Sequence, residues 1–303
     1  MELISLNSFI EIASKKNKKK IAVAAAEDQP ALEAVSEALK LEIVEPMLIG
    51  DEKKIREIAK LINFDLKNIE IINQNIPLQS CKIAVNLVRE GKAQILMKGF
   101  VSTGEFLKAV LDKENGLRSG IMGRGTFLSH IGFFETTNYR KLIALTDAAQ
   151  NIAPTLEDKI NILNNAVDMF HRLGIMLPKV AILAAVENVN IKMPATVEAA
   201  IMTQMNRRNQ IKGCIIDGPL AFDNAISKEA AEHKGIIGEV PGDADILLAP
   251  DIEAGNILYK CFTYIGGATV AAVILGAAAP IVLTSRADTD RSKLMSIALA
   301  ATY

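Results

Sequence analysis

The amino-acid sequence predicts an α/β protein built on a mainly parallel sheet that helices cover on both faces. The first observation is that unbroken apolar runs of strand length alternate with amphipathic helical patterns along almost the whole chain. Strands that are apolar on both sides are typical of parallel sheets buried between two layers of helices. The second observation is size, because 303 residues, of which 50% are hydrophobic, suffice to bury one or two α/β domains.

The predicted strands and helices follow one another in a regular order. We expect the first strand at residues 20–26 (KIAVAAA), and the lysine-rich run 15–20 separates it from a preceding helix. Helices are expected at 31–39 and 52–61. Further strands are expected at 47–49, 69–72, 95–97, 142–145, 180–185, 214–216, 246–248 and 281–283.

One uncharged segment, residues 266–284, is long enough to suggest a membrane span. It is rich in Gly and Ala, and Pro280 interrupts it, so we expect two buried strands at 269–275 and 281–285 instead. The start of the chain lacks the features of a secretory signal. Together with three widely separated cysteines, this favours a soluble protein of the reducing cytoplasm.

Composition and missing motifs argue against several classes of function. The formal net charge of −1 and the scarcity of aromatic residues disfavour nucleic-acid binding. The sequence contains no GxGxxG, Walker A, GxSxG or HExxH motif, and its three histidines and three cysteines form no metal-ligand spacing. Cys81, Cys214 and Cys261 each lie in an apolar segment, where we expect them to pack rather than act as nucleophiles.

Polar residues follow several predicted strands, at the sheet edge where doubly wound proteins bind ligands. The strongest such segment is residues 280–293, in which a buried strand delivers Ser285 and Arg286 to its carboxyl end. Thr289 or Asp290 then caps the last helix. A hydroxyl, a guanidinium and free helix N–H groups suit a tetrahedral phosphate. An ordinary helix cap beside a surface arginine fits the pattern equally well.

A second candidate anion site lies in residues 97–108. Gly99 lets the chain turn, Ser102 or Thr103 opens a helix, and Lys98 supplies positive charge. The alternative is a capped strand-to-helix turn without a ligand.

A third candidate is the glycine-punctuated segment 117–130, which carries Arg118, Arg124, Ser129 and His130. These side chains either line a cleft or belong to a surface loop. Because an apolar strand follows His130 directly, a structural hydrogen-bonding role is favoured for it over proton transfer.

The fourth candidate lies in residues 242–260, where a predicted strand ends just before Asp251. The helix that follows carries Asn256 and Lys260 four residues apart, on one face. This face suits a phosphate or an amide-rich ligand, or else it is a pair of side chains facing solvent.

The succession of these segments resembles the phosphate acetyl/butyryltransferase family. The resemblance covers most of the chain in a consistent order, and the TSRAD form of the last segment is similar to the butyryl branch. The segments that carry it are MKGFVSTGEFLKAVL (97–111), LTDAAQNIAPTLEDKINILNNAV (145–167), KMPATVEAA (192–200), KGCIIDGPLAFDNAIS (212–227), GDADILLAPDIEAGNILYK (242–260) and VLTSRADTDRSKLMSIALAA (282–301).

This resemblance implies two α/β/α domains with mainly parallel sheets and a cleft between them, as in isocitrate and isopropylmalate dehydrogenases. It implies one domain at residues 1–140 with 286–303, and a second at 141–285. It also implies a homodimer or larger homo-oligomer.

The implied activity is that of a phosphotransacylase, which transfers a short acyl group, butyryl or branched, reversibly between coenzyme A and inorganic phosphate. The transfer would be direct, in a ternary complex, with coenzyme A as a substrate and no metal or redox cofactor. In the acetyl branch a Ser-Arg pair, matched here by Ser285 and Arg286, precedes a catalytic aspartate whose position holds Ser292 in this chain. Asp290 or Asp288 is then the expected general base. Arg286 would neutralise phosphate, and Ser285 would steady the developing oxyanion.

The same resemblance assigns the remaining candidates to substrates. Phosphate or acyl substrate is expected at Lys98, Ser102, Thr103, Arg118, Ser129 and His130, and coenzyme A at Asp251, Asn256 and Lys260. Alternatives stay open: a phosphate acetyltransferase, a longer-chain phosphate acyltransferase acting on acyl carrier protein, a metal-dependent decarboxylating dehydrogenase, or a non-catalytic sensor of acyl-CoA or acyl phosphate.

Overall fold

The computed structural model describes residues 2–117, 127–283 and 288–303. The chain forms two compact units, each assembled from two stretches of sequence. One comprises Asn7–Leu128 with Ala271–Tyr303, and the other Met1–Leu6 with Ser129–Val270. We refer to them as the Asn7 unit and the Ser129 unit.

The sheet of the Asn7 unit has the strand order β3-β2-β1-β4-β11-β10. Its strands are β1 (Lys19–Ala24), β2 (Val44–Gly50), β3 (Glu70–Asn73), β4 (Ile95–Lys98), β10 (Thr269–Leu275) and β11 (Ile281–Val282). Every neighbouring pair is parallel except β10 with β11. Because β4 and β11 are parallel neighbours, the segments that follow them leave the sheet at the same edge.

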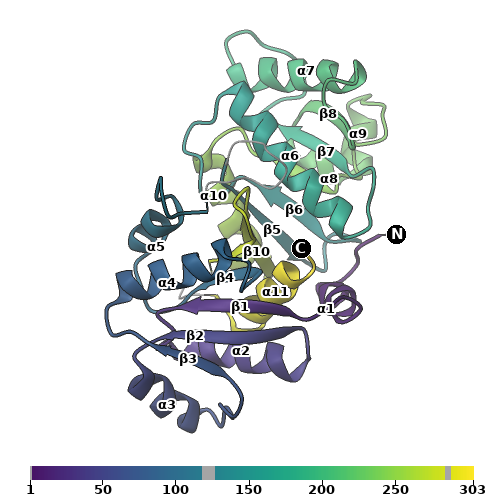
Figure 1. Cartoon of the computed structure of the whole chain (residues 1–303). Helices are drawn as coiled ribbons and strands as arrows, with labels where there is room; N and C mark the ends of the chain where they lie inside the picture. Colours follow the sequence, from purple (N-terminus) through teal and green to yellow (C-terminus); the bar gives the residue numbers. More distant parts are fainter. Residues whose placement is uncertain (1, 118–126, 284–287) are drawn as a thin grey trace. The chain divides into compact units, whose positions relative to one another are not determined.

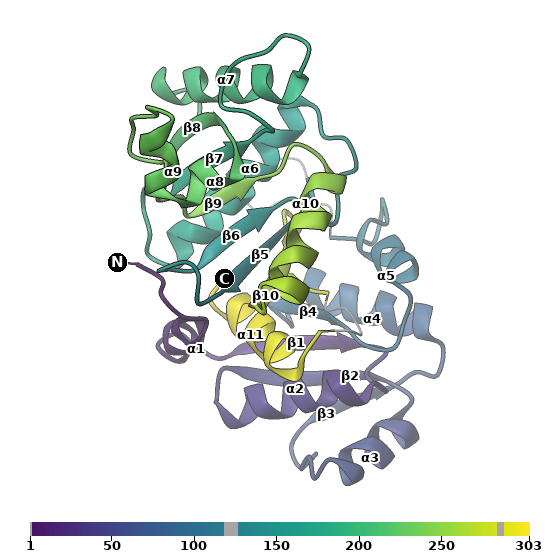
Figure 2. The ribbon, with the colours of Figure 1, turned by 180° about the vertical axis from the view of Figure 1, so that it is seen from behind.

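Helices cover both faces of this sheet. They are α1 (Asn7–Ser14), α2 (Gln29–Lys40), α3 (Glu52–Leu61), α4 (Pro77–Arg89), α5 (Thr103–Val110) and α11 (Asp290–Ala301). Helices α4 and α5 pack together on the face seen in Figure 1, and α2 packs with α11 on the face seen in Figure 2. The core on the α4 side is built from small and aliphatic side chains around Phe106.

The sheet of the Ser129 unit has the strand order β5-β6-β9-β7-β8. Its strands are β5 (Ser129–Glu135), β6 (Ile143–Thr146), β7 (Lys179–Leu183), β8 (Ile215–Leu220) and β9 (Ile246–Leu248). Strands β6, β9, β7 and β8 are parallel to one another, and β5 is antiparallel to β6. The first residues of β5 therefore lie beside the carboxyl end of β6.

The helices of this unit are α6 (Leu156–Arg172), α7 (Pro194–Arg207), α8 (Phe222–Ile226), α9 (Lys228–His233) and α10 (Ile252–Lys260), with a π-helical turn, η2 (Cys261–Ile265). Helix α6 covers the face seen in Figure 1, and α10 covers the opposite face seen in Figure 2. A capping box starts α6, since Thr155 and Asp158 bond reciprocally across the first turn.

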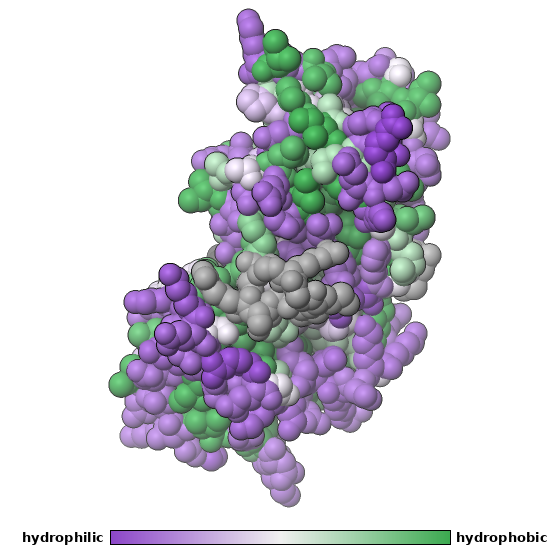
Figure 3. Space-filling model, turned by 45° about the horizontal axis from the view of Figure 1, so that its top comes forward, coloured by the Kyte–Doolittle hydropathy of each residue, from purple (hydrophilic) through white to green (hydrophobic). Residues whose placement is uncertain are grey.

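The expected elements are confirmed in kind, and three match in their bounds: the helix at 52–61 and the strands at 246–248 and 269–275. The uncharged segment 266–284 forms β10 and β11, and no helix in the described part of the chain is long and apolar enough to cross a membrane. Apolar and hydrophilic residues are mixed over the surface drawn in Figure 3.

After residue 128 the chain passes from the Asn7 unit to the Ser129 unit, and after residue 270 it returns. The expected domain boundaries lay at 140/141 and 285/286. Strand pairing accounts for the difference in bounds. β5 pairs with β6, and β11 pairs with β4. The division into folding domains itself stays a prediction.

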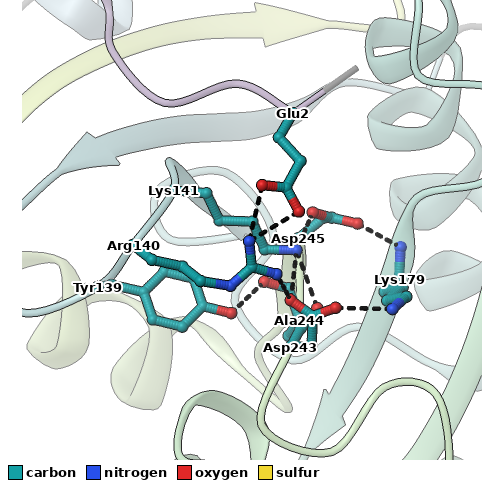
Figure 4. A network of polar contacts seen from close by, with 8 residues as sticks. All are labelled: Glu2, Tyr139, Arg140, Lys141, Lys179, Asp243, Ala244 and Asp245. Carbon is teal, nitrogen blue, oxygen red and sulfur yellow. Dashed lines mark hydrogen bonds and ion pairs between the residues drawn. The ribbon is translucent and has the colours of Figure 1, made fainter.

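An ionic network holds the amino ends of the central strands of the Ser129 unit together (Figure 4). Asp243, just before β9, binds Lys179 at 2.6 Å, Lys141 at 3.0 Å and also Arg140. The ammonium of Lys141, only 4% exposed, also pairs with Asp245. Arg140 reaches Glu2 at 2.7 Å. The network therefore links the N-terminal residues to three strands at the edge opposite their carboxyl ends.

The shift in the pKa of Asp243 on folding reflects the stabilisation that this network gives to the folded state. Burial opposes ionisation of Asp243, but hydrogen bonds from Lys179, Lys141 and Arg140 outweigh it and lower the pKa to about 2. A lowered pKa in the folded state means that the stabilisation is complete above the ordinary carboxyl value and is lost as the pH falls from about 4 to about 2.

We therefore predict that Asp243→Asn lowers the free energy of unfolding at pH 7 by about 1–2 kcal/mol, after allowance for solvent screening. The difference between Asp243→Asn and the parent should shrink below pH 4, as measured by urea unfolding over a pH series. Glu52→Gln, which breaks an exposed pair with Arg56 on α3, is the matched control and should cost less than about 0.5 kcal/mol. Equal losses in the two variants would contradict a role for the network.

Candidate functional site

Two neighbouring strands of the Asn7 unit, β4 and β11, end at the same sheet edge and lead into candidate site residues. The turn after β4 packs tightly on the end of β1. The amide of Gly99 donates to the carbonyl of Ala24 at 2.8 Å, and a Cβ on Gly99 would lie 2.2 Å from the carbonyl oxygen of Ala25. Glycine at position 99 is thus required by the close approach of two backbones.

The side chain of Lys98 hydrogen-bonds to the backbone of its own loop. The buried ammonium of Lys98 donates to the carbonyls of Gly99 and Val101, both at 3.1 Å. Ser102 caps α5, since its Oγ accepts from the amide of Glu105 at 3.2 Å and donates to the Glu105 carboxylate at 2.7 Å. Ser102 and Thr103 are exposed at the positive end of this helix.

The start of α11 carries the second group of candidate site residues in the Asn7 unit. Thr289 is its N-cap, accepting from the amide of Ser292 at 3.2 Å, and its hydroxyl donates to the Ser292 hydroxyl at 3.0 Å. The Asp290 side chain is 77% exposed and Asp288 is half-buried. Lys293 is buried and bonds the Asp288 carbonyl. Ser285 and Arg286 lie outside the described residues.

The Ser129 unit brings a second set of polar side chains to the carboxyl ends of its parallel strands. Ser129 and His130 begin β5, and the register of β5 with β6 pairs Ile131 with Thr146, so His130 and Asp147 are the next residues along the two chains at this end. Ser129 is buried and its Oγ accepts from the side-chain amide of Asn165 on α6 at 2.9 Å. The Thr146 hydroxyl donates to the carbonyl of His130 at 2.7 Å, tying the two strands together.

The two faces of β5 serve different helices, because successive side chains of a strand point to opposite sides. Ser129 and Phe133 face α6, where Phe133 stacks on Phe170 at 5.2 Å between ring centroids. His130 and Phe134 face α10, where both rings contact Tyr259, at 5.8 Å and 5.1 Å.

Asp147 organises the loop after β6. Its carboxylate is buried and accepts from the amides of Ala149 at 2.8 Å and Gln150 at 2.9 Å, and from the side chain of Asn151 at 2.6 Å. The loop is a fixed turn built around one negative charge.

Helix α10 packs against this loop at close range. Asp251 is its N-cap, accepting from the amide of Ala254 at 2.8 Å. The side-chain amide of Asn256 donates to the carbonyl of Ala148 at 3.1 Å, so this residue links α10 to the loop. A Cβ on Gly255 would lie 2.5 Å from the carbonyl oxygen of Asp147. Lys260 is exposed at the end of the helix.

Electrostatics single out His130 in this group. Its side chain is buried, and burial lowers its pKa below the ordinary imidazole value while the charge of Asp147 acts in the opposite direction. Its Nδ1 atom is buried without a hydrogen-bond partner in the described part of the chain. The imidazole is therefore neutral at physiological pH, with one polar atom that no group among the described residues satisfies.

Comparison with known proteins identifies the family. A family model described as phosphate acetyl/butaryl transferase matches residues 5–81 and 74–301. The chain belongs to this family. The phosphate butyryltransferase of Clostridium acetobutylicum is 48% identical over 98% of this chain and 97% of its own length. The probable phosphate butyryltransferase of Bacillus subtilis is 50% identical over the same shares, and the phosphate acetyltransferase of Thermotoga maritima is 43% identical over 98% and 99%.

Solved structures agree with this assignment to the phosphate acetyl/butyryl transferase family. A branched-chain phosphotransacylase from Enterococcus faecalis V583 has a TM-score of 0.81 and 36% identity, and the match covers 94% of this chain and 98% of that one. A 4-hydroxythreonine-4-phosphate dehydrogenase from Klebsiella pneumoniae, 14% identical with a TM-score of 0.54 over 93% of this chain and 98% of that one, shares the fold alone. The expected likeness of the fold to dehydrogenases is confirmed.

The structure brings some of the predicted site residues of this transferase together. Lys98, Ser102 and Thr103 share one turn, Asp288 and Asp290 flank the start of α11, and Ser129, His130, Asp251 and Asn256 lie around the ends of β6 and β9. Arg118, like Ser285 and Arg286, lies outside the described residues. Asp147, Asn151, Asn165 and Tyr259 were missing from the predicted set. For Asp147 the signal was its position two residues after the strand predicted at 142–145.

The packing of α10 yields a stability prediction. Gly255→Ala should lower the free energy of unfolding by about 1–3 kcal/mol, because the added Cβ meets the Asp147 carbonyl and the loop must shift. Gly104→Ala is the matched control: it also lies in a helix but has open space around it, so it should stabilise by about 0.5–1 kcal/mol. Chemical denaturation of both variants measures these values. A neutral Gly255→Ala would show that α10 and the loop do not touch as described.

Proposed function

We propose that the protein is a phosphotransacylase that transfers a short acyl group reversibly between coenzyme A and inorganic phosphate. The observation that carries this proposal is the 48–50% identity with phosphate butyryltransferases over 98% of the chain and 97% of theirs. Identity at this level over whole chains, within one family, supports a shared reaction rather than a shared fold alone.

Within this reaction we propose butyryl or branched-chain acyl groups as substrates. Two relatives named as butyryltransferases are 48% and 50% identical, whereas the acetyltransferase of Thermotoga maritima is 43% identical. The branched-chain phosphotransacylase structure matches at 36% identity. Acyl groups that differ by one methylene are separated by only about 1–3 kcal/mol in a hydrophobic pocket, so activity with acetyl groups should be reduced rather than absent.

We further propose that the acyl group moves directly from one substrate to the other. A covalent acyl-protein would need an activated nucleophile, and cysteine is the obvious choice. Burial raises the pKa of both Cys81 and Cys214 to about 12, so neither forms a thiolate at neutral pH. Cys261 is half-buried in η2.

The proposed substrate contacts follow from helix starts and charge. Ser102 and Thr103 present hydroxyls and free N–H groups at the start of α5, which suits a phosphate. Lys98 contributes by fixing the preceding turn. We assign Ser285 and Arg286 to the phosphate and the oxyanion, and Arg118 and Ser129 to the acyl substrate, on the basis of the family resemblance. Coenzyme A is assigned to Asp251, Asn256 and Lys260 on the same basis.

We also propose a homodimer or larger homo-oligomer in the cytoplasm, acting without a metal or redox cofactor, because the transfer changes no oxidation state. Light scattering of the purified protein tests the oligomer, and a monomer at all concentrations would contradict it. Dialysis against a chelator should leave the rate unchanged.

A thiol-release assay tests the activity. Purified protein receives acetyl-CoA, butyryl-CoA or isobutyryl-CoA, each with and without phosphate, and free thiol is followed with a chromogenic disulfide. We expect phosphate-dependent release, fastest with a four-carbon substrate. Release with none of the three would contradict the proposal, and ligand binding without turnover would point to a sensor.

Arg286 provides a sharper test of the phosphate site. If Arg286 pairs with phosphate in the transition state, Arg286→Gln should lower kcat/KM by about 30-fold to 800-fold, equivalent to roughly 2–4 kcal/mol. Arg291→Gln removes an exposed guanidinium only five residues away, on α11, and should keep parental kinetics. Similar kinetics in the two variants would remove Arg286 from the mechanism.

A further inference from the structure

The identity of the proton acceptor is the open question in the proposed reaction. When coenzyme A attacks an acyl phosphate, its thiol must lose a proton, because the thiolate is the nucleophile. Ser292, at the position of the acetyl branch's aspartate, has its hydroxyl bonded to Thr289. Asp290 is 77% exposed and lies 3.8 Å from Lys293. A carboxylate in contact with solvent is a poor acceptor for a thiol whose pKa is about 8.5.

His130 has the position that such an acceptor needs. It opens β5 beside the carboxyl end of β6, at the edge where parallel α/β sheets bind ligands. Its ring lies on the α10 side, 5.8 Å from the ring of Tyr259. The neighbouring Ser129 faces α6, so the two side chains leave the strand on opposite faces.

The state of His130 also suits proton transfer. The side chain is 8% exposed, yet its Nδ1 atom has no hydrogen-bond partner in the described part of the chain. Leaving a buried polar atom unpaired costs free energy, and a bound substrate group that hydrogen-bonds to it relieves that cost. Burial lowers the pKa, so the ring is in the unprotonated form that accepts a proton.

Among the described residues, a carboxylate and a phenol face the imidazole from the elements packed against it. Asp147, after β6, carries a negative charge that favours the imidazolium, and Tyr259 on α10 supplies an aromatic wall. Both oxygens of Asp147 are held by hydrogen bonds from Ala149, Gln150 and Asn151, so this charge is fixed in place. A fixed carboxylate beside a histidine stabilises the imidazolium formed during catalysis.

We infer that His130 is the general base that takes the thiol proton of coenzyme A, a role that rests on the proposed function. The proton moves from sulfur to a ring nitrogen as the sulfur–carbon bond forms at the acyl carbon. The carbon–oxygen bond to phosphate then breaks, and the imidazolium returns the proton to the departing phosphate, which leaves as hydrogenphosphate. In the opposite direction the imidazolium protonates the departing thiolate.

Three variants test the inference against a purely structural role. Asn and Gln place an amide near the Nδ1 and Nε2 positions respectively but accept no proton. Both His130→Asn and His130→Gln should lower kcat about 100-fold or more, while KM for acyl-CoA changes less than threefold. Added imidazole should partly restore the rate of His130→Ala. His233→Gln, which removes an exposed histidine on α9 of the same unit, is the matched control and should behave as the parent.

Each outcome decides the question. Activity within threefold of the parent in His130→Asn or His130→Gln would overturn the inference. Large losses in well-folded variants, with no response to imidazole, would make His130 a positioning residue and overturn it as well. A parent protein without thiol release would instead sink the proposed function.

A measurement on the parent protein covers the case in which the variants fail to fold. Only three histidines are present, so NMR resolves three imidazole Cε1–H signals. Coenzyme A should shift the His130 signal further than desulfo-coenzyme A, which lacks the thiol. Identical spectra with the two ligands would show that the thiol does not reach His130.

Discussion

Both candidate sites depend on one constraint. Buried parallel strands form backbone hydrogen bonds with their neighbours, and their carboxyl ends therefore lie at the same edge of the sheet. In the Asn7 unit this brings the carboxyl ends of β4 and β11 to neighbouring positions. In the Ser129 unit it gathers the exits of β6, β9 and β7. The antiparallel β5 begins at the same edge, and this reversed direction is what places the start of β5, with His130, beside the carboxyl end of β6.

The amino and carboxyl ends of the parallel strands in the Ser129 unit have different roles. At the amino ends, the ionic network around Asp243 and Lys141 clamps the strands and the N-terminal residues. At the carboxyl ends, polar groups are held in fixed turns, and one polar atom, His130 Nδ1, has no hydrogen-bond partner among residues 2–117, 127–283 and 288–303. Stability concentrated at one edge allows the other to keep a buried polar atom for a ligand.

The order of strands and helices was predictable from the sequence because apolar periodicity decides it locally. Residues 246–248 and 270–275 are uninterrupted apolar runs, and the strands expected at 246–248 and 269–275 have those bounds. The direction of β5 and β10 was not predictable, since strand pairing depends on partners far away in the chain. The bounds of the compact units follow from those pairings.

The site was predictable only as a set of residue types. Ser102 and Thr289 cap helices as their positions suggested. Lys98 was expected to offer its charge to a ligand, which stays a prediction, and the hydrogen bonds of its ammonium to two carbonyls of its own loop were not predictable. Asn256 and Lys260 share a helix, yet Asn256 turns to the Ala148 carbonyl, a contact made possible by the small Gly255. Sequence spacing carries no information about such tertiary hydrogen bonds.

The central claim is direct transfer of an acyl group between coenzyme A and phosphate, and isotope exchange tests it most directly. The protein is incubated with butyryl-CoA and isotopically labelled coenzyme A, first without phosphate and then with it. Direct transfer predicts no label in butyryl-CoA until phosphate is added, and rapid exchange afterwards. Exchange in the absence of phosphate would reveal an acylated protein, and no exchange under either condition would contradict the transferase assignment.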